Sequence, residues 1–107
     1  MPYIVITSKY PSDLGPQVAK RYLEAIKEFP SDDRIAVEIV PAAVKATTEG
    51  LNVIAIVEVK EGKLEEALKL RGSRSVMFQN IAGYEYSMDV YLKVEEALAL
   101  IGMSMPK

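Results

Sequence analysis

The longest apolar stretch of the chain, residues 51–59, has a pattern that predicts a β-strand with apolar groups on both faces. Every second residue from Leu51 to Val59 is apolar and falls on one side of the strand, whereas Ile54 and Ile56 occupy the middle of the other side. A strand of this kind has to be covered on both faces. We therefore expect it inside a sheet, with the rest of the chain arranged around it.

Three further segments have the composition of strands. Residues 2–8 are rich in β-branched side chains with apolar groups on both faces, which predicts a second internal strand followed by a loop over residues 9–15. Residues 34–48 are extended but contain Pro41, which cannot donate to a strand ladder, so this strand is expected at an edge, or bent, or both. Residues 84–92 alternate between apolar and polar side chains, as in a strand with one buried and one wetter face.

Two segments have apolar residues at three- and four-residue steps, which predicts two amphipathic helices. The first begins at Pro16 and ends before Pro30, and the second begins near Leu64 and extends to residue 78. Gly72 lies inside the second helix, where it costs about 1 kcal/mol relative to alanine, so we expect a break, a kink or a functional reason there. A short third helix over residues 94–101 is expected to stop at Gly102.

The order of these elements predicts a single α+β domain over residues 1–107. It matches a ferredoxin-like βαββαβ sandwich with an antiparallel four-stranded sheet and an extra C-terminal helix. Both main helices are then expected on one face of the sheet, while the other face exposes apolar side chains of the two internal strands. Monomers rarely expose large apolar patches. The sequence therefore predicts a homodimer through the sheet face, with a higher oligomer left open.

Composition excludes several classes of chemistry. The chain has no cysteine and no histidine, which excludes disulfides, thiolate nucleophiles and the usual general base near neutral pH. Its formal net charge of −2 offers no basic surface for nucleic acid. No apolar run reaches the length of a membrane span, and the first residues lack the pattern of a signal peptide. We expect a cytoplasmic protein with no metal, no cofactor and no membrane partner.

Two segments resemble the dimeric α+β barrel superfamily, namely EVKEGKLEEAL at residues 58–68 and IAGYEY at residues 81–86. The chain also looks like small uncharacterised archaeal proteins of this length. The superfamily includes small cofactor-independent monooxygenases, stress-responsive barrel proteins and ligand-sensing domains of regulators. The resemblance implies two sheets packed face to face, which would cover the bare side of residues 51–59. The histidine at the reactive site of several of these enzymes has no counterpart here.

The most distinctive polar cluster of the sequence is the segment 71–75, Arg-Gly-Ser-Arg-Ser. Arg71 and Arg74 lie three residues apart on the expected second helix and share a side, so with the neighbouring serines they could hold a phosphate or a carboxylate. The alternative is a solvated helix face that pairs with Glu65, Glu66 or a partner subunit.

Two residues outside this cluster are further candidates for ligand binding. Lys45 with Glu49 would form a catalytic pair only if burial lowered the pKa of the lysine; otherwise Lys45 is an edge-strand lysine that discourages aggregation. Tyr91 is expected on the wetter face of the last strand, where its phenol could line a ligand cavity. Tyr84 and Tyr86 alternate in phase with apolar neighbours and are expected in the core or in an interface.

Two functions remain compatible with these observations. The first is a homo-oligomeric module that binds a small anionic or apolar ligand between helices and sheet. The alternative is a cofactor-independent monooxygenase or isomerase of the barrel superfamily that uses Tyr, Arg and Glu side chains. A structural subunit of another protein is a third hypothesis. A deep pocket containing Arg74 or Tyr91 would favour the enzyme, whereas a fully packed interior would favour the module.

Overall fold

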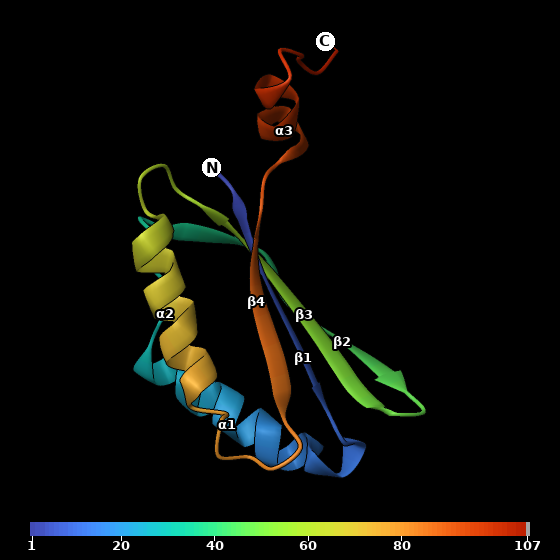
Figure 1. Cartoon of the computed structure of the whole chain (residues 1–107). Coiled ribbons are helices and arrows are strands. Elements are labelled where there is room, and N and C mark those ends of the chain that lie inside the picture. The colour runs from blue at the N-terminus through green and yellow to red at the C-terminus, as the bar shows by residue number, and fades with distance from the viewer. Residues whose placement is uncertain (107) are drawn as a thin grey trace.

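The computed structural model describes residues 1–106 and has an α+β architecture (Figure 1). Four strands form one antiparallel sheet accompanied by three α-helices, an arrangement consistent with a ferredoxin-like fold. In chain order the elements are β1 (Tyr3–Tyr10), a 3₁₀ turn (Ser12–Leu14), α1 (Gly15–Glu28), β2 (Ala36–Thr47), β3 (Gly50–Val59), α2 (Leu64–Val76), β4 (Glu85–Tyr91) and α3 (Val94–Leu100).

The strand order across the sheet is β2-β3-β1-β4, and all neighbouring strands are antiparallel. The strands β3 and β1 are therefore internal, as their apolar patterns predict. The edge strand β2 shifts its register against β3 between Glu38 and Val40 and again between Val40 and Ala43. These irregularities flank Pro41, so β2 is irregular as well as peripheral, because proline has no N–H to contribute to the ladder.

The helices α1 and α2 cover one face of the sheet with two separate apolar clusters. Separate clusters leave room between them for polar side chains. One cluster lies beside α1 and contains the buried residues Tyr10, Val18, Ala25, Phe78 and Ile81. The other lies beneath the first turns of α2 and contains Ile4, Val57, Val59 and Ala67.

No helix of residues 1–106 covers the opposite face of the sheet (Figure 1). Val5 pairs with Ile56 and Thr7 pairs with Ile54 across β1 and β3, so these four side chains share this face. Ile54 is 39% exposed. The sheet thus has one packed face and one bare face with apolar side chains, as the alternation along β3 predicts.

Two parts of the chain project from the body (Figure 1). They are the hairpin of β2 and β3 and the C-terminal segment that contains α3. The Cα radius of gyration is 15.5 Å, compared with about 13 Å for a compact domain of this length. The described chain is therefore extended. Within residues 1–106, no helix has both the length and the hydrophobicity that a membrane span requires.

The first strand is longer than the sequence predicts. A loop was expected from residue 9, but β1 continues through Lys9 to Tyr10. Tyr10 is buried and its ring stacks on that of Tyr84, with centroids 5.8 Å apart. The burial of this aromatic ring outweighs the turn-forming residues that follow it.

Of the expectations for Gly72, a break in the helix is wrong, because α2 runs without interruption from Leu64 to Val76. Gly72 does not have a positive φ. A Cβ atom added there would come within 4.0 Å of the Met88 Cε atom, an ordinary van der Waals contact. The helix therefore accommodates a glycine in its interior, since most helical stability in proteins comes from tertiary packing and not from intrinsic propensity.

A glycine is required in the turn between β2 and β3. Gly50 has a φ of +133°, and a Cβ atom there would lie 2.5 Å from the carbonyl oxygen of Tyr10. Only glycine adopts this conformation without strain. It allows the hairpin to pass directly against the end of β1.

Candidate functional site

Two arginines of α2 converge on one carboxylate of β2. Arg71 Nη2 lies 3.0 Å from Glu38 Oε1, and Arg74 Nη1 lies 3.9 Å from the same oxygen. The two arginines share a helix face because they are three residues apart. Glu38 faces them because it lies opposite Val57, whose side chain is buried under the helices.

Arg74 is also tied to the end of α1. Its Nε donates a hydrogen bond of 2.7 Å to the carbonyl oxygen of Phe29, the C-cap residue of α1, and its Nη2 donates one of 3.2 Å to Ser31 Oγ. The last carbonyl groups of a helix lack intrahelical partners and carry partial negative charge, so a cation is favourable there. Ser31 in turn donates a hydrogen bond of 2.9 Å to Glu38 Oε1.

The cluster of Arg71, Arg74 and Glu38 carries a formal charge of +1, from two guanidinium groups and one carboxylate. Burial, followed by the charge of Arg71, lowers the pKa of Arg74, yet a guanidinium stays protonated at neutral pH. Burial acts to raise the pKa of Glu38, but the hydrogen bonds from Ser31 and Arg71 and the two arginine charges outweigh it and lower this pKa. Glu38 therefore stays ionised, and one positive charge of the cluster has no counterion within it.

The cluster forms part of the wall of a cavity between the helices and the sheet. The cavity has a volume of about 90 Å³, smaller than the roughly 150 Å³ of an engineered apolar cavity that binds benzene. The side chain of Arg74 is only 9% exposed. The cavity is therefore a mostly apolar space with a cation in its wall. Its lining includes Ile6, Ile26, Val53, Ala55, Phe78, Tyr22, Tyr84, Arg71 and Arg74.

Two tyrosines bring phenol groups to this cavity. The Tyr84 ring stacks between Phe78 and Tyr10, with centroid distances of 4.8 Å and 5.8 Å. Burial is the main cause of the raised pKa of Tyr84, so its phenol is neutral and can donate a hydrogen bond at physiological pH. Tyr22 comes from α1 and is partly exposed, which places it at the rim.

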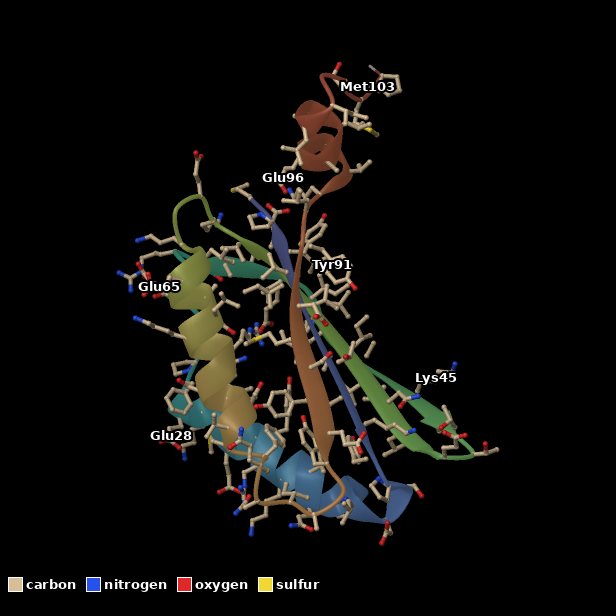
Figure 2. All side chains as sticks on the ribbon, in the orientation of Figure 1. Glu28, Lys45, Glu65, Tyr91, Glu96 and Met103 are labelled. Carbon is tan, nitrogen blue, oxygen red and sulfur yellow. The ribbon has the colours of Figure 1, made fainter. Side chains whose placement is uncertain are left out.

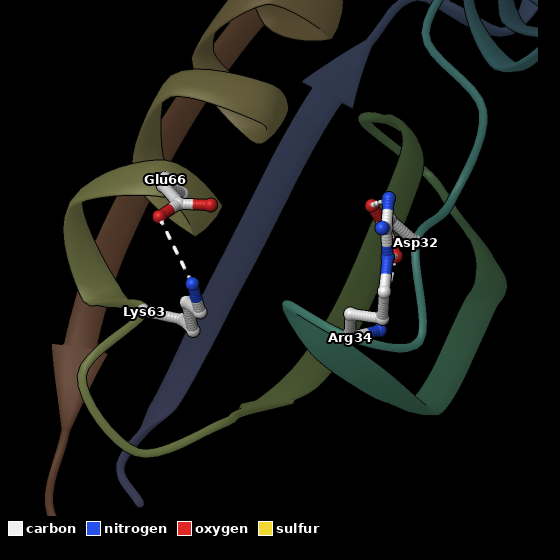
Figure 3. Close-up of polar contacts among 4 residues, drawn as sticks. All are labelled: Asp32, Arg34, Lys63 and Glu66. Atoms are coloured by element: carbon white, nitrogen blue, oxygen red, sulfur yellow. Dashed lines mark hydrogen bonds and ion pairs between the residues drawn. The ribbon is translucent and has the colours of Figure 1, made fainter.

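The structure thus brings Arg71 and Arg74 together, as their spacing predicts, but with a different partner. Of the partners named in the alternative interpretation, Glu65 and Glu66 do not pair with these arginines. Glu65 pairs with Lys69 on the surface, and Glu66 pairs with Lys63 at 3.3 Å (Figure 3).

The other two predicted ligand-binding residues do not join this cavity. Tyr91 pairs with Tyr3 and lies on the bare face, while Lys45 lies on the projecting hairpin (Figure 2). Lys45 lies on the edge strand β2, and the conditional alternative of a pair with Glu49 is not formed, because Glu49 pairs with Lys9 at 3.2 Å. Lys45 instead lines a shallow depression of about 590 Å³ on the bare face.

Glu38 and Ser31 were not predicted from the sequence as members of the site. The sequence contained one indication of Glu38, which is the single charged residue of the otherwise apolar segment 35–40. It lies on the same side of the strand as Ala36, which faces the helices. An ionised group at a half-buried strand position requires a partner. The sequence does not show which cation supplies it, because Arg71 lies 33 residues away.

Comparison with protein families and with curated proteins finds no match for this sequence. Within residues 1–106, no three acidic side chains gather in a way that could hold a metal ion.

Proposed function

We propose that this protein is a small homo-oligomeric module that binds a small organic anion in the cavity between its helices and its sheet. The observation that carries the proposal is the buried guanidinium of Arg74 at an otherwise mostly apolar cavity. A charge in such surroundings is favourable when an anion accompanies it. Glu38 supplies only one negative charge for two arginines, which leaves the cluster with a preference for a second one.

The ligand class follows from the cavity. Guanidinium groups bind carboxylates and phosphates through charge-assisted hydrogen bonds. The volume of about 90 Å³ and the side chains of Ile6, Val53 and Phe78 favour a carboxylate with a short apolar tail over a phosphate ester. Nη1 of Arg74 makes no hydrogen bond within residues 1–106 and is the donor that such a carboxylate would use.

The oligomeric part of the proposal rests on the bare sheet face. It carries Ile54, Ile56 and Val5 from the two internal strands, and a second copy would remove these side chains from water. A face-to-face homodimer is the assembly found in the dimeric α+β barrel superfamily, which the sequence resembles.

Binding of propionate, with propionamide as its uncharged analogue of similar size, tests the anion site. The signal to follow is the Nε–Hε resonance of Arg74 in the ¹⁵N-labelled protein. We expect saturable shifts with propionate, on the order of a millimolar Kd, which about 4 kcal/mol from five non-hydrogen atoms can supply. Propionamide should bind at least about tenfold more weakly, because it lacks the charge. Equal binding of the two compounds, or no saturation, would show that the site does not select anions.

The variant Arg74→Lys keeps the charge but loses the forked geometry, and it should weaken propionate binding about tenfold. In this variant and its control the signal to follow is the Nε–Hε resonance of Arg71, which lines the same cavity. Arg34→Lys is the matched control. Arg34 is a surface arginine that pairs with Asp32 at 2.9 Å (Figure 3), so its replacement should leave the affinity unchanged. Circular dichroism of both variants verifies that they fold.

A cofactor-independent enzyme is the second candidate function. The observation that favours it is the presence of Tyr84 and Tyr22 in the same cavity as Arg74, because a neutral phenol can donate a proton. An experiment in deuterated buffer distinguishes the two candidate functions. Exchange of the protons next to the carboxylate of bound propionate would indicate proton-transfer chemistry, whereas an unchanged ligand over hours supports the binding module.

A further inference from the structure

The C-terminal arm, residues 92–105, projects beyond the end of the sheet without apolar support. In Figure 1 it continues from β4 and ends far from both main helices, and Figure 2 shows Met103 near its tip. Leu100 is 77% exposed, and none of the residues of α3 is buried. The arm nevertheless carries a row of large apolar side chains: Val94, Leu100, Ile101, Met103 and Met105.

Polar contacts hold the root of the arm in place. Lys93 Nζ lies 2.6 Å from Glu58 Oε2 and 5.6 Å from the centre of the Tyr3 ring. Glu96 accepts a hydrogen bond from the backbone N–H of Lys93 and pairs with the amino group of Met1. The root is therefore anchored to the sheet while the apolar side chains beyond it have nothing to cover them.

The second uncovered surface is the sheet depression, whose lining includes Thr7, Lys9, Ala43, Lys45, Ile54 and Glu85. It lies at the hairpin end of the sheet, opposite the end from which the arm leaves. Residues 3 to 9 of β1 separate the two places by about 20 Å, at roughly 3.3 Å per residue. The arm points away from the depression of its own chain (Figure 1).

A two-fold axis brings these two surfaces together. When two copies of the sheet pack face to face with their strands antiparallel, the arm end of each copy lies over the hairpin end of the other. Charge favours this orientation. The depression has Lys9, Lys45 and Glu85 in its lining and so a formal charge of +1, whereas the arm has Lys93, Glu95 and Glu96 and a formal charge of −1. In this arrangement Glu95 of one copy approaches Lys45 of the other. With parallel strands, the acidic arms would instead face each other.

We propose that the C-terminal arm of each chain docks in the sheet depression of a second copy of this chain, so that two copies exchange arms. The proposal rests on the homodimer of the proposed function and adds the arm to its interface. The exchange also accounts for the extended shape of the single chain, because the projecting arm would be covered by the second copy in the dimer.

Cross-linking between two single-cysteine variants tests the exchange, because the natural chain has no cysteine. Lys45→Cys and Glu95→Cys are prepared separately, mixed until subunits have exchanged, and treated with a short bismaleimide. We expect a covalent dimer that contains one copy of each variant, identified by intact mass. The matched control replaces Lys45→Cys by Lys20→Cys on the outer side of α1, which should give no such product.

Every other outcome of the cross-linking experiment would contradict the proposal, and the outcomes can be told apart. A dimer that yields no mixed cross-link overturns the arm exchange and leaves the proposed sheet-to-sheet dimer standing. A cross-link of Glu95→Cys to itself shows parallel strands, and a monomer overturns the exchange and the homodimer together.

A second variant tests whether the apolar side chains of the arm contribute to the dimer or only lie near the second copy. Leu100→Glu should weaken the dimer at least tenfold in sedimentation equilibrium, because it places a charge in the docked arm. Leu23→Glu replaces a leucine that is 62% exposed on α1 and should leave the dimer unchanged. Equal dimerisation of both variants would show that the arm does not dock through its apolar side.

Discussion

At the level of single residues, Arg74 has a structural role in the fold, to which our proposal adds a role in binding. Its Nε and Nη2 atoms hold the carbonyl of Phe29 and the hydroxyl of Ser31, so the guanidinium joins the end of α1 to α2. Its Nη1 atom remains for the cavity. A lysine in this place could not satisfy all these acceptors from one ammonium group, since the planar fork of arginine fixes its donors in different directions.

Glu38 makes the stability of the fold dependent on pH. Its folded-state pKa is lowered below the ordinary value of 4.5, so the ionised carboxylate stabilises the folded state above that pH, and this contribution is lost as the pH falls through the lowered pKa. Glu38→Gln should therefore cost on the order of 1 kcal/mol at pH 7 and much less at pH 3. Urea unfolding at the two pH values measures the difference.

The control for this prediction is Glu65→Gln, which removes an exposed partner of Lys69. Such a surface pair contributes only a few tenths of a kcal/mol. A pH dependence that is the same for both variants would mean that Glu38 has no special role in the arginine cluster.

At the level of elements, the continuity of α2 leads to a prediction about Gly72. The glycine has no positive φ, and an added methyl group would meet only the flexible Met88 side chain at 4.0 Å. Gly72→Ala should therefore stabilise the protein by about 0.5–1 kcal/mol, mainly because alanine restricts the unfolded chain. The free energy of unfolding in urea measures this. A loss of stability would show that the methyl group does not fit between α2 and β4.

The alternation of apolar side chains predicted the internal strands because it reflects burial on two faces. Ile54 and Ile56 lie on the bare face and Val57 in the core, as the period of two requires. Pro41 likewise indicated an irregular edge strand, since its missing N–H is a local property. Features that depend on one residue and its neighbours in the chain could thus be predicted from the sequence.

The candidate site could be predicted only in part. The spacing of Arg71 and Arg74 placed them on one face of α2, but their partner Glu38 comes from another element. Which carboxylate meets them depends on how β2 packs beside α2. The cavity has the same origin, since it exists because two apolar clusters under the helices do not merge. Such properties arise from packing between distant segments, which no local pattern contains.

At the scale of the whole molecule, the extended shape is what the proposed homodimer would account for. Its dimensions are 48 × 31 × 19 Å, with a bare apolar sheet face and a projecting arm. A specific dimer interface buries roughly 800 Å² on each partner, and the bare face and the arm together offer apolar surface for it. The same chemistry that fills a core, removal of apolar side chains from water, would then act between copies.

Ile54→Glu tests this view at the centre of the bare face. In a lone chain a glutamate at this 39% exposed position can reach water and should be tolerated. In a face-to-face dimer it places an unpaired charge between two sheets, which costs about 3–5 kcal/mol and should weaken the dimer at least about 100-fold or make the protein insoluble. Native mass spectrometry and sedimentation equilibrium report the change. Val76→Glu, at an exposed position near the end of α2, is the control that should keep the natural state. A soluble, stable dimer of Ile54→Glu would refute packing through the sheet face, because no arrangement of that kind leaves room for the buried charge.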